Sequence, residues 1–172
     1  WFILLCFSNL IADVRYIDEV FNEVNKTEDV VYANAPDLPF IFLFEWNTFD
    51  IDLDMDIYEP EGDTVTNRPA LIVIHTGAFF SGHNELDDVK ALSISAAKRG
   101  YVVFNINYRL GLNVLSSYSG ERAVYRALQD GSAAVRFLRE YHYEYSIDPN
   151  NIFMWGTSAG AFVSLHLAYT DD

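Results

Sequence analysis

Hydrophobic and polar residues alternate strictly over residues 51–57, "IDLDMDI". This period of two predicts a strand with one buried and one solvent-facing side. Residues 70–74, "ALIVI", and 101–106, "YVVFNI", are instead almost continuously apolar, as expected for strands covered on both faces of a parallel sheet. Residues 151–155 have the same character and predict a further buried strand.

Helical periodicity separates these strands. Residues 84–99 carry a rough apolar stripe and end at Gly100, which predicts a helix stop there. Residues 121–141 form a stronger amphipathic segment, and residues 161–169 predict a packed helix. Together the elements predict an α/β fold with a doubly wound, mostly parallel sheet.

The alternating strand carries three carboxylates, Asp52, Asp54 and Asp56, on its predicted solvent face. A calcium loop would need glycine at its sixth position, and counting from Asp50 that position is Met55. We therefore favour an acidic face that protects an early strand from edge pairing.

Composition narrows the possible ligands. The chain has 11 Lys and Arg against 25 Asp and Glu, a formal net charge of −14, so no nucleic-acid partner is expected. Its one cysteine, Cys6, excludes an intrachain disulfide and a cysteine-based metal site. No metal or organic cofactor is predicted.

The first seven residues, "WFILLCF", form an apolar run that gives way to polar sequence near Ala12. We interpret residues 1–12 as the remnant of a signal peptide, which predicts a secreted or periplasmic protein. A buried first strand or helix is the alternative. The run is too short to span a bilayer.

A second pattern carries chemistry. Residues 150–162, "NNIFMWGTSAGAF", run from a predicted strand through Gly-Thr-Ser-Ala-Gly into a predicted helix. At so sharp a turn Ser158 must adopt a strained backbone, and Gly156 and Gly160 must be small for the chain to pass itself. The Ala159 amide then lies at a positive helix end, where it favours an oxyanion. Ser158 is thus a candidate nucleophile.

Four segments resemble the α/β-hydrolase superfamily, and within it the carboxylesterase and lipase groups. They are "HTGAFFSG" at 75–82, "AKRGYVVFNINYRLG" at 97–111, "AVYRALQDGSAAVRFLRE" at 123–140 and "DPNNIFMWGTSAGA" at 148–161. The resemblance implies an α/β-hydrolase sheet with early antiparallel strands, incomplete at its carboxyl end. Residues 13–172 would form the amino-terminal part of one such domain.

The same resemblance assigns roles. Ser158 would be the nucleophile of a serine ester hydrolase, and Gly77, Ala78 and Ala159 would offer backbone amides to the oxyanion. His75 would shape the oxyanion loop rather than act as the base. The family's His-Gly-Gly-Gly loop differs here at Thr76 and Ala78. Phe79, Phe80 and Tyr108 are candidates for an apolar acyl pocket, although core packing explains them equally well.

In this fold the acid and the histidine follow the serine, yet only 14 residues follow Ser158. His166 lies eight residues into the same helix, roughly 12 Å along its axis, and is a poor base.

The sequence thus predicts an inactive amino-terminal piece of a longer esterase acting on a small-molecule ester. The alternatives are a peptidase or other acyl-transfer enzyme of this fold, and a non-catalytic binding protein. Oligomeric state is not predicted. Four further residues are set aside as the histidine or the acid of the triad: His83, His142, Asp171 and Asp172.

Overall fold

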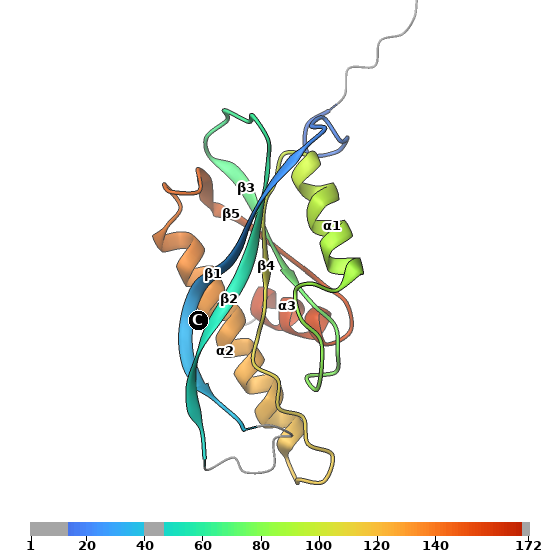
Figure 1. The fold of residues 1–172 in the computed structure, drawn as a ribbon, viewed down its shortest axis with the longest axis vertical. Coiled ribbons are helices and arrows are strands. Elements are labelled where there is room, and N and C mark those ends of the chain that lie inside the picture. The colour runs from blue at the N-terminus through green and yellow to red at the C-terminus, as the bar shows by residue number, and fades with distance from the viewer. Residues whose placement is uncertain (1–13, 40–46, 170–172) are drawn as a thin grey trace, which may run out of the picture.

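The computed structural model describes residues 14–39 and 47–169. In this part of the chain five strands form one mixed sheet in the order β1-β2-β4-β3-β5 (Figure 1). Their bounds are β1 Val24–Asp37, β2 Phe49–Pro60, β3 Arg68–Ile74, β4 Val102–Ile106 and β5 Ile147–Gly156. The helices are α1 Asp87–Lys98, α2 Ser119–Glu140 and α3 Ala159–Tyr169. The predicted leader at 1–12 lies outside the described residues, and N-terminal sequencing of the mature protein would test it.

The sheet has an antiparallel and a parallel part. β1 pairs with β2 and β2 with β4 in antiparallel register, while β3 pairs in parallel with both β4 and β5. The carboxyl ends of β3, β4 and β5 therefore lie at one edge of the sheet. The predicted early antiparallel strands are confirmed, but β1 itself was not predicted.

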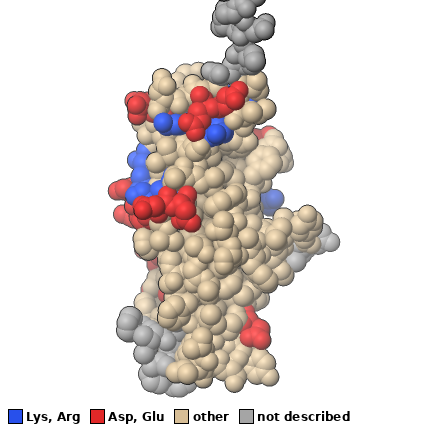
Figure 2. All heavy atoms as spheres, turned by 90° about the vertical axis from the view of Figure 1, so that its right-hand side faces the viewer, with Lys and Arg blue, Asp and Glu red and all other residues tan. Residues whose placement is uncertain are grey.

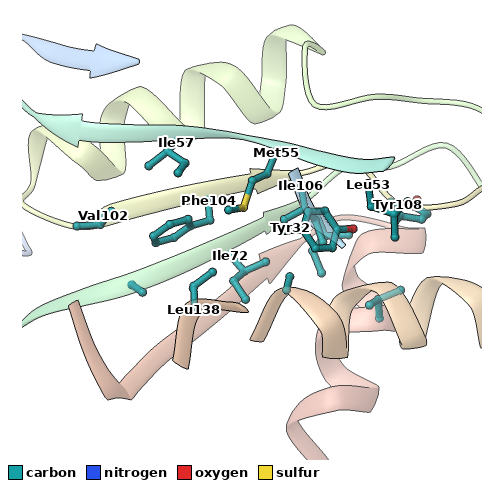
Figure 3. Close-up of a cluster of buried hydrophobic side chains, with 14 of the residues drawn as sticks. Tyr32, Leu53, Met55, Ile57, Ile72, Val102, Phe104, Ile106, Tyr108 and Leu138 are labelled. Carbon is teal, nitrogen blue, oxygen red and sulfur yellow. The ribbon is translucent and has the colours of Figure 1, made fainter. Parts of the chain in front are cut away.

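Helices cover both faces of the sheet, as predicted. Apolar residues of β2, β3 and β4 pack against α2 and α3 on one face, where Met55, Phe104 and Leu138 meet (Figure 3). On the other face Tyr58 and Val103 pack against Val89 of α1. All five residues of β4 are buried, which explains why that strand reads as a continuous apolar run.

Helix α1 ends where the sequence predicts. Gly100 has φ 105°, and its amide donates to the Ala97 carbonyl at 2.8 Å. The left-handed region is accessible to glycine without a Cβ penalty. The segment before β1 closes this end of the helix, because the amides of Val20 and Phe21 both donate to the Lys98 carbonyl at 3.0 Å.

Two predictions about the acidic strand are wrong. Asp56 is only 2% exposed rather than on a solvent face. Its carboxylate lies 3.0 Å from Lys26 Nζ, and Lys26 also pairs with Glu85 just before α1. Nor does the strand need protection from edge pairing, since β2 lies between β1 and β4. Asp52 is exposed as predicted, and Asp54 is half-buried.

The prediction that residues 151–155 form a strand covered on both faces is also wrong. In the described part of the chain β5 is an edge strand, and Phe153 is 51% exposed. Apolar composition reports a preference for burial, but it does not report which strands lie at an edge.

The surface agrees with the charge balance. Seen from the side of α1, basic and acidic side chains lie against one another in the upper part of the molecule and form no basic stripe on this face (Figure 2). No helix among residues 14–39 and 47–169 is long and apolar enough to cross a membrane.

Candidate functional site

Ser158 occupies the turn between β5 and α3, at the edge of the sheet where β3 and β4 also end. Its φ is 51°, in the left-handed region that a non-glycine residue rarely adopts. Ser158 is exposed to solvent. The turn thus has the strained geometry that the sequence predicts and presents a hydroxyl to solvent.

The two glycines of the turn leave no room for a side chain. A Cβ on Gly156 would lie 2.4 Å from the Gly160 carbonyl carbon. A Cβ on Gly160 would lie 2.2 Å from the Ile74 carbonyl oxygen and 3.0 Å from that of His75. The start of α3 is therefore pressed onto the end of β3, where the loop bearing Gly77 and Ala78 begins.

This loop, residues 75–82, is tightly folded. Gly77, Ala78 and Phe79 have φ values of 128°, 54° and 58°, so three successive residues lie in the left-handed region. The amides of Phe80 and Ser81 both donate to the Gly77 carbonyl, at 2.9 and 3.0 Å. Ala78 holds this conformation although glycine would do so at lower energetic cost.

Three backbone amides at the site have no acceptor among the described residues. They are the amides of Gly77, Ala78 and Ala159. None of these three main-chain nitrogens donates a hydrogen bond to a described residue. Ala159 begins α3, so its amide lies at the positive end of the helix dipole. Unpaired donors beside a solvent-exposed hydroxyl can stabilise an anion that forms there.

His75 supports the loop from within the protein. It is 1% exposed, and its Nδ1–H donates to the Thr76 carbonyl at 2.6 Å. Its ring stacks on Tyr108 with centroids 4.3 Å apart, and the Tyr108 hydroxyl donates to the His75 carbonyl at 3.1 Å. Burial lowers the pKa of His75, so the ring is neutral at neutral pH.

The three candidate pocket aromatics have different environments. Tyr108 is buried and Phe80 is 58% exposed. Phe79 lies between these extremes, with its ring edge-to-face on both Tyr108 and Phe162. Tyr108 therefore belongs to the support of the loop rather than to an open pocket.

Of the other described histidines, His142 and His166 lie away from the hydroxyl by topology, whereas His83 follows the 75–82 loop at the same edge of the sheet as Ser158. His142 follows α2 at the opposite edge of the sheet, where β5 begins, and His83 accepts the Glu85 amide. His166 stacks on Phe162 in α3, two helical turns beyond Ser158. Asp171 and Asp172 lie outside the described residues. No group of three or more metal-ligating side chains occurs in residues 14–39 and 47–169.

Residues 55–172 match the family BD-FAE, and this segment contains both the 75–82 loop and the Ser158 turn. The chain belongs to the BD-FAE family. The BD-FAE match and the mixed sheet with helices on both faces identify a carboxylesterase-like α/β hydrolase.

Similar proteins agree with this assignment. Para-nitrobenzyl esterase of Bacillus subtilis is 33% identical over 63% of this chain, and carboxylesterase 3B of Mus musculus is 32% identical over 64%. Neuroligin-2 of Homo sapiens is 29% identical over 90% of the chain. These matches cover 22%, 19% and 17% of the three proteins, so the chain spans about a fifth of the length of these relatives.

Among solved structures, a butyrate-bound esterase of Thermogutta terrifontis is 26% identical, with a TM-score of 0.54 over 66% of this chain and 38% of that one. A second structure of this esterase 2, phosphonylated by sarin, is 25% identical with a TM-score of 0.54 over 66% of this chain and 39% of that one.

One buried ion pair is not predicted from the sequence. Arg109 and Asp130 are 7% and 1% exposed, and their side chains meet at 2.6 Å. Asp130 also accepts the Arg109 amide at 2.8 Å, while Arg109 donates to the Pro36 carbonyl at 2.8 Å. The pair thus joins the segment after β4 to α2 and to β1. The sequence feature that indicates such a pair is an aspartate among the apolar positions of the 121–141 helix.

Proposed function

We propose that the full-length protein is a serine hydrolase of carboxylic esters and that Ser158 is its nucleophile. The observation that carries the proposal is the exposed Ser158 at φ 51°, at the same edge of the sheet as the unpaired amides of Gly77, Ala78 and Ala159. The esterases among its relatives and structural neighbours support the same chemistry.

In the proposed reaction Ser158 Oγ attacks the ester carbonyl carbon while its proton passes to a histidine. The carbonyl oxygen becomes an oxyanion that accepts hydrogen bonds from the three amides. Collapse of this intermediate releases the alcohol, which takes the proton, and leaves an acyl group on Ser158. Water then attacks the acyl group with the same histidine as base, and the carboxylic acid leaves. No metal or organic cofactor enters these steps.

We place that histidine and its acid partner outside residues 1–172. The described histidines support this, because His75 is buried with its Nδ1–H bound to a carbonyl and His166 lies roughly 12 Å along the helix from Ser158. The 172-residue chain alone should therefore show little or no turnover.

Pre-steady-state hydrolysis of an activated p-nitrophenyl ester tests the proposal. The full-length protein should release a burst of p-nitrophenol equal to its concentration of active sites, followed by slower turnover. Ser158→Ala should abolish the burst, while Ser117→Ala, at an exposed serine before α2, should keep it. A burst that survives in Ser158→Ala, or Ser158-dependent turnover by residues 1–172 alone, would contradict this account.

A non-catalytic binding protein is the second candidate. One observation favours it: the 75–82 loop departs from the family's glycines at Thr76 and Ala78, the part of the site that would hold the oxyanion. Absence of both burst and turnover in the folded full-length wild type would support it. A peptidase or other acyl-transfer enzyme would instead keep the Ser158-dependent burst but prefer amide or other acyl substrates in a substrate profile.

A further inference from the structure

Phe162 lies one helical turn after Ser158. Its amide donates to the Ser158 carbonyl at 3.1 Å, and side chains on a helix lean back toward its amino end. The side chain of Phe162 therefore leans toward the turn that carries Ser158. It is nevertheless 51% exposed, so burial alone does not account for a large aromatic residue here.

Across the site, the ring of Phe162 meets Phe79. The two centroids are 6.4 Å apart and the ring planes make an angle of 89°, the edge-to-face arrangement that aromatic pairs prefer. Phe79 directly follows Ala78, whose amide is a proposed oxyanion donor. One ring contact thus joins the residue next to a donor to the helix that carries the nucleophile.

Hydrogen bonds anchor residues 75–79 to the segment that follows β4. The Phe79 carbonyl accepts the amides of Gly111 and Leu112 at 2.8 and 2.9 Å, and Tyr108 donates to His75. All three donors follow β4. No hydrogen bond in the described part of the chain joins residues 75–79 to α3. The loop, with two non-glycine residues at positive φ, is therefore tied to β4 by hydrogen bonds and to α3 by packing.

We propose that Phe162 is a positioning residue, and this inference rests on the proposed function. Its edge-to-face contact with Phe79 fixes the Gly77 and Ala78 amides at the distance from Ser158 that the oxyanion requires. Phe162 itself touches neither the reacting atoms nor their protons. Loss of the contact raises the energy of the transition state, in which the oxyanion exists, more than that of the bound ester.

Steady-state kinetics of the full-length protein with a p-nitrophenyl ester test this role. Phe162→Leu should lower kcat about fivefold, within the roughly 2- to 13-fold range to which the energy of one edge-to-face pair converts, with KM nearly unchanged. Phe162→Tyr keeps the ring and should retain wild-type kcat. Tyr169→Leu makes the same kind of change at an 84% exposed position of the same helix and should have no effect.

A double-mutant cycle separates positioning from general damage. Phe79→Leu should lower kcat at least as much, because Phe79 also contacts Tyr108. Adding Phe162→Leu to it should cost little more than Phe79→Leu alone, because both changes remove the Phe79–Phe162 contact. Additive losses, a wild-type kcat in Phe162→Leu, or a Phe162→Tyr variant as slow as Phe162→Leu would overturn the inference. Thermal melting of each variant identifies any loss caused by unfolding.

Failure of the proposed function gives a different result. If Ser158→Ala keeps the burst, Ser158 is not the nucleophile, and the inference about Phe162 falls with that function. If Ser158→Ala abolishes the burst while Phe162→Leu matches wild type, only the positioning role is wrong.

Discussion

Gly160→Ala tests whether the close packing of α3 on β3 sets the geometry of the site. The new Cβ would lie 2.2 Å from the Ile74 carbonyl oxygen, and ordinary contact begins at 3.4 Å. The start of α3 must therefore move by about 1.2 Å relative to the end of β3, because both partners are backbone. A misplacement of about 1 Å can cost roughly 10²-fold in rate, and overpacking of this kind typically costs about 1–3 kcal/mol in stability.

Gly120→Ala is the matched control. Gly120 is the second residue of α2, and a Cβ there would meet only Leu112 Cδ1 at 3.7 Å, an ordinary contact. Alanine at such a helical position should stabilise the fold by roughly 0.4–1 kcal/mol. Urea unfolding and the rate of reaction with a fluorophosphonate, both on the full-length protein, give the two readouts. If Gly160→Ala is as stable and as reactive as Gly120→Ala, the tight turn is not what positions Ser158.

Two further predictions concern the buried support of the site. Asp130→Asn should destabilise the protein by about 3–5 kcal/mol in urea unfolding, because Arg109 is left buried without its charge partner. The control Glu19→Gln, at an exposed pair with Arg99, should have little effect. Equal destabilisation by the two variants would refute the reasoning. Because burial lowers the pKa of His75 in the folded state, the unfolded chain binds the extra proton, so stability should fall as pH drops below about 6.5. His75→Gln should flatten this dependence between about pH 5 and 6.5, and an unchanged slope would show that His75 is not its source.

Local patterns predict the elements that build the site. The continuous apolar runs before His75 and Gly156 become β3 and β5, and the Gly-Thr-Ser-Ala-Gly turn has the predicted strain at Ser158. These features follow from neighbouring residues, whose sterics restrict the chain whatever packs around it.

The features that the sequence did not predict depend on distant contacts. Asp56 is buried because Lys26 and the segment before α1 close over it. Asp130 pairs with a residue 21 positions away, and Tyr108 reaches His75 across 33. β1 was missed because its sequence, "VNKTEDVVYANAPD", mixes charges with apolar residues and its pairing with β2 shifts register twice, which breaks the period of two.

The central claim is that Ser158 is the nucleophile, and mapping a covalent adduct tests it most directly. The full-length protein would be treated with a fluorophosphonate, digested and analysed by peptide mass spectrometry. We predict one phosphonyl group per molecule, on Ser158, and none in Ser158→Ala. An adduct on another residue, or equal modification of the two proteins, would contradict the account.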